Sequence, residues 1–178
     1  MTSKYDPVEI SLDDLREVGR WAISWAEQVL PIYESRVKGD PRPRASIQGA
    51  REFIDGGPRT QQLRIQALDA YRAAVESTDP AASAAAHASC LIASLAYTHP
   101  IAAVHQTKHL LGPVAFAAIA LEIVGGGASS IGEAEVAIAI EAASPSVREV
   151  VGRYPEVASG KKPVDRLMFA LDRGLRVR

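Results

Sequence analysis

A short charged corner, Asp40-Pro41-Arg42-Pro43-Arg44, holds the residues whose types and spacing most clearly suggest chemistry. Its two prolines fix the backbone angle φ at positions 41 and 43, so the segment is predicted to be stiff and extended. It therefore presents one carboxylate and two guanidinium groups in a nearly fixed arrangement. Such a corner could be a structural clasp between helices or a recognition surface for a partner, and the residues leave both open.

Nearby charged and aromatic residues are predicted to act together with this corner. Charged groups beside a rigid turn commonly stabilise local geometry, so we favour the structural interpretation. In that interpretation Asp40 pairs with Arg42 or Arg44 and orients the following helix, because arginine can pair bidentately with a carboxylate. An exposed tryptophan would instead anchor a partner, because Trp and Arg are enriched at binding hot spots. The predicted partner-binding or structural corner comprises Trp21, Glu34, Asp40, Arg42, Arg44 and Arg51.

Two histidines have the spacing of possible metal ligands. His105 and His109 are four residues apart, so on a helix they would share a face and could offer two nitrogen ligands. No His-Glu-x-x-His pattern accompanies them, and Lys108 would place a positive charge on the same helix. A third ligand, from His87 or His99, would depend on how the helices pack. We therefore predict no metal and no cofactor, and keep His99, His105 and His109 as weak metal candidates only.

The composition sets limits on the class of protein. The chain has 178 residues, of which 47% are hydrophobic and 23% charged, with a formal net charge of -1. This balance argues against a general nucleic-acid binder, which would show a basic excess. We expect no secretory signal, because residues 1–7 contain no apolar run. We also expect no membrane span, because the longest apolar run, 110–124, contains Gly112-Pro113 and Glu122. The single cysteine, Cys90, fits a reducing compartment, so we expect a cytoplasmic protein with an inert, buried thiol.

The elements that must position these residues are all predicted to be helices. Apolar residues recur at helical spacing, and the chain shows no strong strand pattern. The sequence thus predicts an all-α fold, a compact multi-helix bundle of about seven or eight helices. Residues 1–124 are expected to form the core domain, and residues 125–178, after a triple glycine, a helical extension packed on the same domain. The helices are expected near 12–33, 43–54, 58–74, 80–98, 101–124, 130–143, 145–154 and 163–172.

Local signals predict where several helices begin, bend and end. Ser11 and Asp79 are expected to cap the first and fourth helices, and Ser144-Pro145 to start the seventh. Pro31 is expected to kink or end the first helix, and Pro58 to lie in the first turn of the third. A kink or break is expected at Gly112-Pro113. Ser130-x-x-Glu133 has the pattern of a capping box, and Gly174 is expected to end the last helix.

The order of these features supports a family resemblance over about residues 11–124. The chain resembles the Imm-5-like family of immunity proteins associated with bacterial polymorphic toxin systems. The resemblance implies an all-α, cytoplasmic protein that protects its producer by binding a toxin. It rests on a Trp-containing first helix, Glu34, the charged corner, an amphipathic helix with Arg51, a Gly/Pro linker, and alanine-rich helices with His87, His99 and His109.

We therefore expect a non-enzymatic binding protein that neutralises a protein toxin by occlusion. Two other classes remain as alternatives. The first is a metal-dependent or other enzyme, which requires the histidines to converge on a pocket with a carboxylate such as Glu34 or Glu122. The second is a homo-oligomeric structural module assembled through alanine-rich helix faces. A histidine cluster in a cleft would favour the enzyme, and exposed faces of small apolar residues would favour the oligomer.

Overall fold

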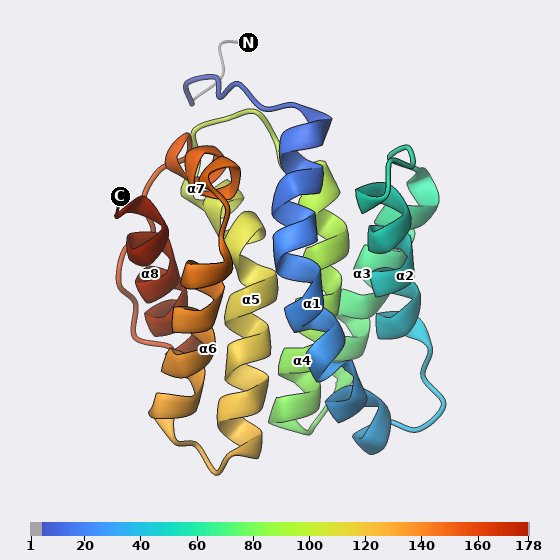
Figure 1. Ribbon diagram of the computed structural model, residues 1–178. Coiled ribbons are helices and arrows are strands. Elements are labelled where there is room, and N and C mark those ends of the chain that lie inside the picture. Colours follow the sequence, from blue (N-terminus) through green and yellow to red (C-terminus); the bar gives the residue numbers. More distant parts are fainter. Residues whose placement is uncertain (1–4, 178) are drawn as a thin grey trace.

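A computed structural model describes residues 5–177, which fold into eight α-helices and one short 3-10 helix (Figure 1). This confirms the predicted all-α bundle of seven or eight helices. Within these residues the β pairing is limited to one isolated bridge between Pro7 and Ile101. The helices are α1 (Leu12–Arg36), α2 (Arg42–Ile54), α3 (Gln61–Glu76), α4 (Pro80–Ser94), the 3-10 helix η1 (Leu95–Tyr97), α5 (Val104–Val124), α6 (Ser129–Ala142), α7 (Pro145–Gly152) and α8 (Pro163–Arg176).

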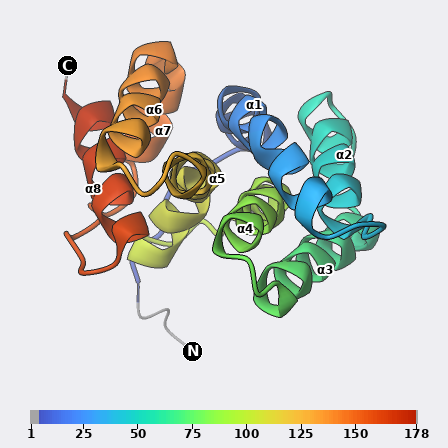
Figure 2. The same ribbon diagram turned by 90° about the horizontal axis from the view of Figure 1, so that it is seen from below.

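Helices α4 and α5 form the centre of the bundle and run in opposite directions (Figure 1). Helix α4 packs against α1, α2 and α3 on one side, whereas α5 carries α6 and α8 on the other, as the end view shows (Figure 2). Most alanines of α4 are fully buried. Their small side chains let the neighbouring helix axes approach closely. The length and apolar composition of α5 would suffice to cross a membrane, but most of this helix is buried inside the bundle as a core helix.

Three helix starts follow the side-chain caps that the sequence indicates. Ser11 and Asp14 form a capping box, in which the Ser11 Oγ accepts from the Asp14 N–H at 3.0 Å. Asp79 accepts from the N–H of Ala82 at 2.8 Å, and Ser144 caps α7. Each cap satisfies a backbone donor that has no partner within its own helix. The predicted starts of α1, α4 and α7 are therefore confirmed.

Prolines account for three differences from the predictions. The charged corner is not extended: Pro41 has φ -85° and ψ -8°, and α2 already begins at Arg42, because a proline fits the first turn of a helix. Helix α1 does not end at Pro31, which is exposed, and continues to Arg36. Helix α3 begins at Gln61 rather than in the turn containing Pro58, because Thr60 is the cap and accepts from the Leu63 N–H at 3.1 Å. The Pro58 prediction was wrong because a stronger N-cap residue follows two positions later.

Glycines and a missing cap account for the other differences. Helix α5 runs without a break through Gly112 and Pro113 and starts at Val104 rather than at 101. Helix α6 starts at Ser129 with no side-chain cap, so the capping box predicted at 130–133 was wrong. Helix α8 continues through Gly174, where an added Cβ would lie 2.2 Å from Ile140 Cδ1 of α6. This glycine allows two helices to approach closely and does not end the helix.

The helices after the triple glycine pack on the rest of the bundle through side chains from both parts of the chain. The indole N–H of Trp21 in α1 donates to the carbonyl of Ala139 in α6 at 2.9 Å. Arg166 of α8 donates to the buried carboxylate of Glu122 in α5 at 2.8 Å. These contacts join α1 and α5 to the C-terminal helices, so the bundle is continuous across residue 124.

Candidate functional site

The charged corner is organised around the carboxylate of Asp40, between the end of α1 and the start of α2. The Arg42 guanidinium donates to it, with Nη2 2.7 Å from Oδ2, and the Arg42 backbone N–H donates to Oδ1 at 3.0 Å. The hydroxyl of Tyr33, a buried residue of α1, donates to Oδ2 at 2.6 Å. Arg42 also reaches Glu76 at the end of α3, at 2.7 Å. One carboxylate and one guanidinium therefore connect three helices.

The protonation states of this cluster follow from its hydrogen bonds. Donation from Arg42 lowers the pKa of Asp40 to about 2, outweighing the opposite effect of burial. Burial raises the pKa of Tyr33 to about 12, and its hydrogen bond to the Asp40 carboxylate adds to this shift. Asp40 is therefore ionised and Tyr33 neutral at physiological pH, which is the combination that keeps the hydrogen bond between them.

The other arginines of the corner are also paired with carboxylates. Arg44 makes a bidentate pair with Glu34 of α1, at 2.6 and 2.7 Å. Arg51 pairs with Glu27 of the same helix. The structure thus joins five of the six predicted corner residues into ion pairs between α1, α2 and α3.

The sixth residue, Trp21, is not brought to the corner. Its ring is buried, packs against Trp25 and lies under α6.

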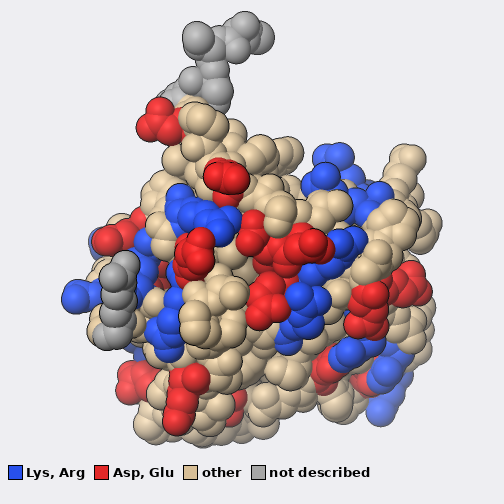
Figure 3. Space-filling view, turned by 45° about the horizontal axis from the view of Figure 1, so that its top comes forward, with Lys and Arg blue, Asp and Glu red and all other residues tan. Residues whose placement is uncertain are grey.

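Elsewhere on the molecule, acidic and basic side chains lie side by side over the face in Figure 3, with no large area of a single sign.

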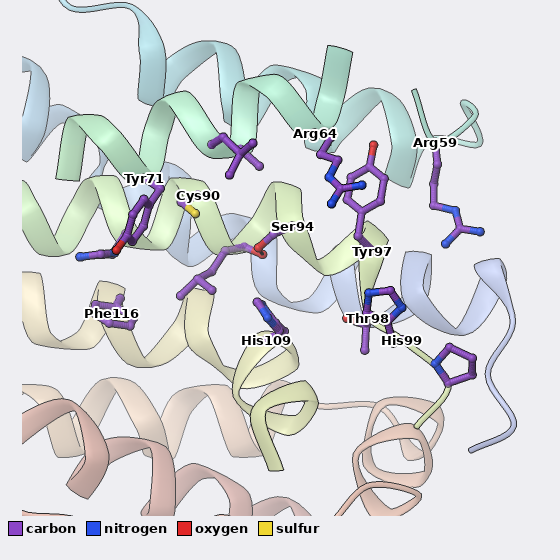
Figure 4. A pocket seen from close by; sticks show the side chains of 15 residues that line it. Arg59, Arg64, Tyr71, Cys90, Ser94, Tyr97, Thr98, His99, His109 and Phe116 are labelled. Carbon is purple, nitrogen blue, oxygen red and sulfur yellow. Dashed lines mark hydrogen bonds between the residues drawn. The ribbon is translucent and has the colours of Figure 1, made fainter. Parts of the chain in front are cut away.

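A groove that the sequence analysis did not identify lies between α3, α4 and the first half of α5, with a volume of about 740 Å³ (Figure 4). Its lining is mostly apolar and aromatic. It contains Arg59 and Arg64 but no Asp or Glu. The lining residues are Arg59, Arg64, Ala67, Leu68, Tyr71, His87, Cys90, Leu91, Ser94, Tyr97, Thr98, His99, Pro100, His109 and Phe116.

Three rings form what we call the aromatic end of the groove: Tyr71, His87 and Phe116. The His87 ring centroid lies 4.8 Å from that of Phe116 and 5.8 Å from that of Tyr71. Burial lowers the pKa of His87, so its imidazole is neutral at pH 7. An uncharged ring between two apolar rings makes this end of the groove suited to apolar groups.

The opposite end, which we call the cationic end, is formed by Arg59 and Arg64 beside Tyr97 (Figure 4). Arg59 donates to the carbonyl of Ala96 at 3.3 Å. Within residues 5–177, neither Arg59 nor Arg64 has a carboxylate partner, unlike the arginines of the corner. The two guanidinium groups therefore keep most of their donors available to an anion.

The outer face of α3 carries four exposed apolar side chains next to this groove. Ile65, Leu68, Tyr71 and Val75 are 42%, 51%, 50% and 63% exposed. Their spacing of three, three and four residues places them on one side of the helix. We call this set the α3 stripe. Its signal was present in the sequence, since α3 has apolar residues on two faces and only one face can contact the core.

Two of the three weak metal candidates, His99 and His109, line the same groove as His87, but no carboxylate in the described part of the chain lines it with them. His99 lines the groove, and its backbone N–H donates to Gln106. His109 also lines the groove. Its Nδ1 is buried and has no hydrogen-bond partner among the described residues, and burial lowers the pKa of this histidine. His105 packs instead against the ring of Tyr5. Among residues 5–177, no group of three or more His, Cys, Asp or Glu side chains could hold a metal ion.

The remaining candidates are also placed by the structure. Glu34 and Glu122, the carboxylates considered for an enzyme, are paired with arginines and do not line the groove. Cys90 is buried at the groove floor, and burial raises the pKa of its thiol to about 11. The thiol is therefore protonated at neutral pH, which makes it a poor nucleophile.

Comparison with known proteins gives one match. A family model described as "Imm-5 like putative immunity protein" matches residues 9–144. The match extends beyond residue 124, where the resemblance noted in the sequence ended, and includes α6. No curated protein and no solved structure matches the chain.

Proposed function

Because this chain belongs to the Imm-5 like family of immunity proteins, we propose that it binds a protein toxin and neutralises it by covering a surface that the toxin needs. In this proposal the protein is a cytoplasmic binder without catalytic activity. The observation that supports it is the α3 stripe, a continuous exposed apolar surface on a rigid helix. Exposed apolar patches on folded proteins commonly mark interaction sites.

The α3 stripe has the properties of a protein-binding surface. Leu68 and Tyr71 lie at its centre and are each about half exposed. Tyrosine is enriched among the residues that contribute most to binding energy. Helix α3 packs against both α2 and α4, so its backbone is already ordered before a partner binds. Binding to a preformed surface costs little conformational entropy.

The charged corner then has a positioning role. Its arginines are already paired within the molecule, so recruiting them to a toxin would require breaking those ion pairs. The Arg42–Glu76 pair fixes the C-terminal end of α3 to the start of α2, next to Val75 of the stripe. The corner thus holds the C-terminal end of α3 in place, and with it the α3 stripe.

The test uses an affinity capture followed by a toxicity assay. The full chain, an Ile65→Glu/Val75→Glu variant and an Ile138→Glu control are used to capture proteins from the native host. Ile138 is 54% exposed on α6, far from α3, so the control makes the same kind of change elsewhere. The captured protein is then expressed alone in an unrelated bacterium, and with each form of the chain.

We expect the captured protein to arrest growth, and the wild type and the Ile138→Glu control to restore it. The stripe variant should fold, as judged by circular dichroism, but fail to restore growth. A captured protein that is harmless would contradict the immunity function. Rescue by the stripe variant would contradict the assigned surface, and a wild-type dimer that the variant disrupts would favour self-association instead.

A further inference from the structure

We propose that the groove between α3, α4 and α5 binds an elongated apolar organic anion, with its anionic group at the cationic end and its apolar body extending toward the aromatic end. This inference concerns a small molecule and does not depend on the proposed toxin binding. The groove volume of about 740 Å³ lies within the range of about 300–1,000 Å³ typical of small-molecule sites. Such sites are mostly apolar, with a few polar groups that fix orientation.

The anionic group is indicated by Arg59 and Arg64, two arginines that lie together at one end of the groove. Arg42, Arg44 and Arg51 all bind carboxylates, whereas the two groove arginines have none within residues 5–177. The lining also lacks any Asp or Glu that would compete for them. Guanidinium groups bind carboxylates through paired, charge-assisted hydrogen bonds. The groove therefore has a built-in preference for a negative group at this end.

The middle of the groove requires the ligand to be apolar there. Leu68 and Leu91 line it, and the Cys90 thiol at its floor is protonated, so it carries no charge. A polar ligand segment would lose its hydration against Leu68, Leu91 and the uncharged thiol, and the two leucines offer it no hydrogen bond in return, which is costly. An alkyl or aryl segment has no hydrogen bonds to water to lose, and it gains buried contact area.

The length of the ligand follows from the two ends. Arg64 and Tyr71 lie on the same helix, seven residues apart. At about 1.5 Å per residue, this separates their backbone positions by about 10 Å. Figure 4 shows Arg59 and Arg64 at one end of the groove and Tyr71 and Phe116 at the other. A medium-chain monocarboxylate fits this arrangement, with its terminal carbons against the aromatic end.

The test is isothermal titration calorimetry of the full-length protein with octanoate, using 1-octanol as the neutral probe of equal chain length. Arg64→Gln removes the guanidinium, and Arg173→Gln serves as the matched control. Arg173 lies on α8, stacks over the ring of Phe169 and, in the described part of the chain, also lacks a carboxylate partner. Thermal unfolding of each variant verifies folding before titration.

We expect one octanoate per chain, with affinity reduced about tenfold or more by Arg64→Gln and unchanged by Arg173→Gln, as the loss of a charge-assisted hydrogen bond predicts. 1-Octanol should bind the wild type about as weakly as octanoate binds the Arg64→Gln variant. No octanoate binding, equal binding of octanoate and octanol, or an equal loss in both variants would each overturn the proposal. Because Arg64 is not part of the α3 stripe, this result and the toxin experiment can fail separately.

Discussion

At the scale of single residues, Asp40 is the group on which most interactions of the charged corner converge. Its carboxylate accepts from Tyr33, from the Arg42 side chain and from the Arg42 backbone. All three donors favour the ionised form, so the folded protein holds the proton of Asp40 less tightly than the unfolded chain does. The corner should therefore stabilise the fold in a way that depends on pH.

Replacing Asp40 by Asn should reveal this dependence. The pKa of Asp40 falls from its ordinary 3.8 to about 2 on folding. Its contribution is thus fully present above about pH 4 and is lost as the pH falls toward 2. We expect Asp40→Asn to lower the free energy of unfolding by about 2 kcal/mol at pH 6 and by much less near pH 2.

Urea denaturation of both proteins at several pH values between 2 and 6 measures this difference. Asp69→Asn is the control, because Asp69 pairs with Arg72 on an exposed helix face and should contribute less than about 1 kcal/mol. A difference between wild type and Asp40→Asn that stays constant over this pH range would show that the carboxylate charge is not what stabilises the corner.

At the scale of helices, glycines determine how closely neighbours pack. Gly174 in α8 faces Ile140 of α6, where a Cβ would overlap three atoms of the isoleucine side chain. At Gly152, the end of α7, no atom of residues 5–177 outside its chain neighbours and its own helix backbone lies within 4 Å of the corresponding position. We expect Gly174→Ala to lower the free energy of unfolding by about 1–3 kcal/mol through overpacking. Gly152→Ala should be neutral or stabilise by up to about 1 kcal/mol through helix propensity.

Thermal unfolding followed by circular dichroism compares the two variants. Both substitutions add one methyl group to a helical glycine, so the difference between them isolates the contact with Ile140. If Gly174→Ala melted at or above the wild-type temperature, α6 and α8 could separate at little cost, and the close approach would not be important for stability.

The same glycine illustrates how far the sequence predicts the helices. The caps at Ser11, Asp79 and Ser144 were predicted because they act within one turn of the chain. Gly174 was misassigned as a helix end because a glycine that ends a helix and one that faces another helix look alike in the sequence. Only the position of α6 distinguishes them.

The candidate site also has one part that the sequence predicts and one part that it does not. Asp40 and Arg42 are two residues apart, so their pairing could be anticipated from the sequence. The groove could not, because its lining comes from α3, α4, α5 and the connections between them. Arg64, for example, gives no sequence signal of lacking a carboxylate partner, since that depends on every neighbouring element.

At the scale of the whole molecule, α5 is shared by the helices on either side of it. It packs against α1 and α4 on one side and against α6 and α8 on the other. A fragment of residues 1–127 would expose the apolar surface of α5 that α6 and α8 cover. It would also remove Arg166, leaving the Glu122 carboxylate unpaired, and remove the acceptor of the Trp21 indole.

We expect this fragment to unfold without a cooperative transition and to bind the dye ANS, which reports exposed apolar surface. Calorimetry and dye fluorescence of the fragment and the full chain provide the comparison. A monomeric fragment that unfolds cooperatively within a few degrees of the full chain would show instead that the first five helices form an independent unit.

The position of the two tryptophans has a practical consequence. Trp21 and Trp25 lie on α1 with ring centroids 6.0 Å apart, and the Trp21 indole N–H donates a hydrogen bond to the Ala139 carbonyl of α6. Neither tryptophan lines the groove or belongs to the α3 stripe, where the phenol and phenyl rings are those of Tyr71, Tyr97 and Phe116. Intrinsic tryptophan emission therefore reports whether α1 and α6 remain joined, and it is optically separate from events at the groove.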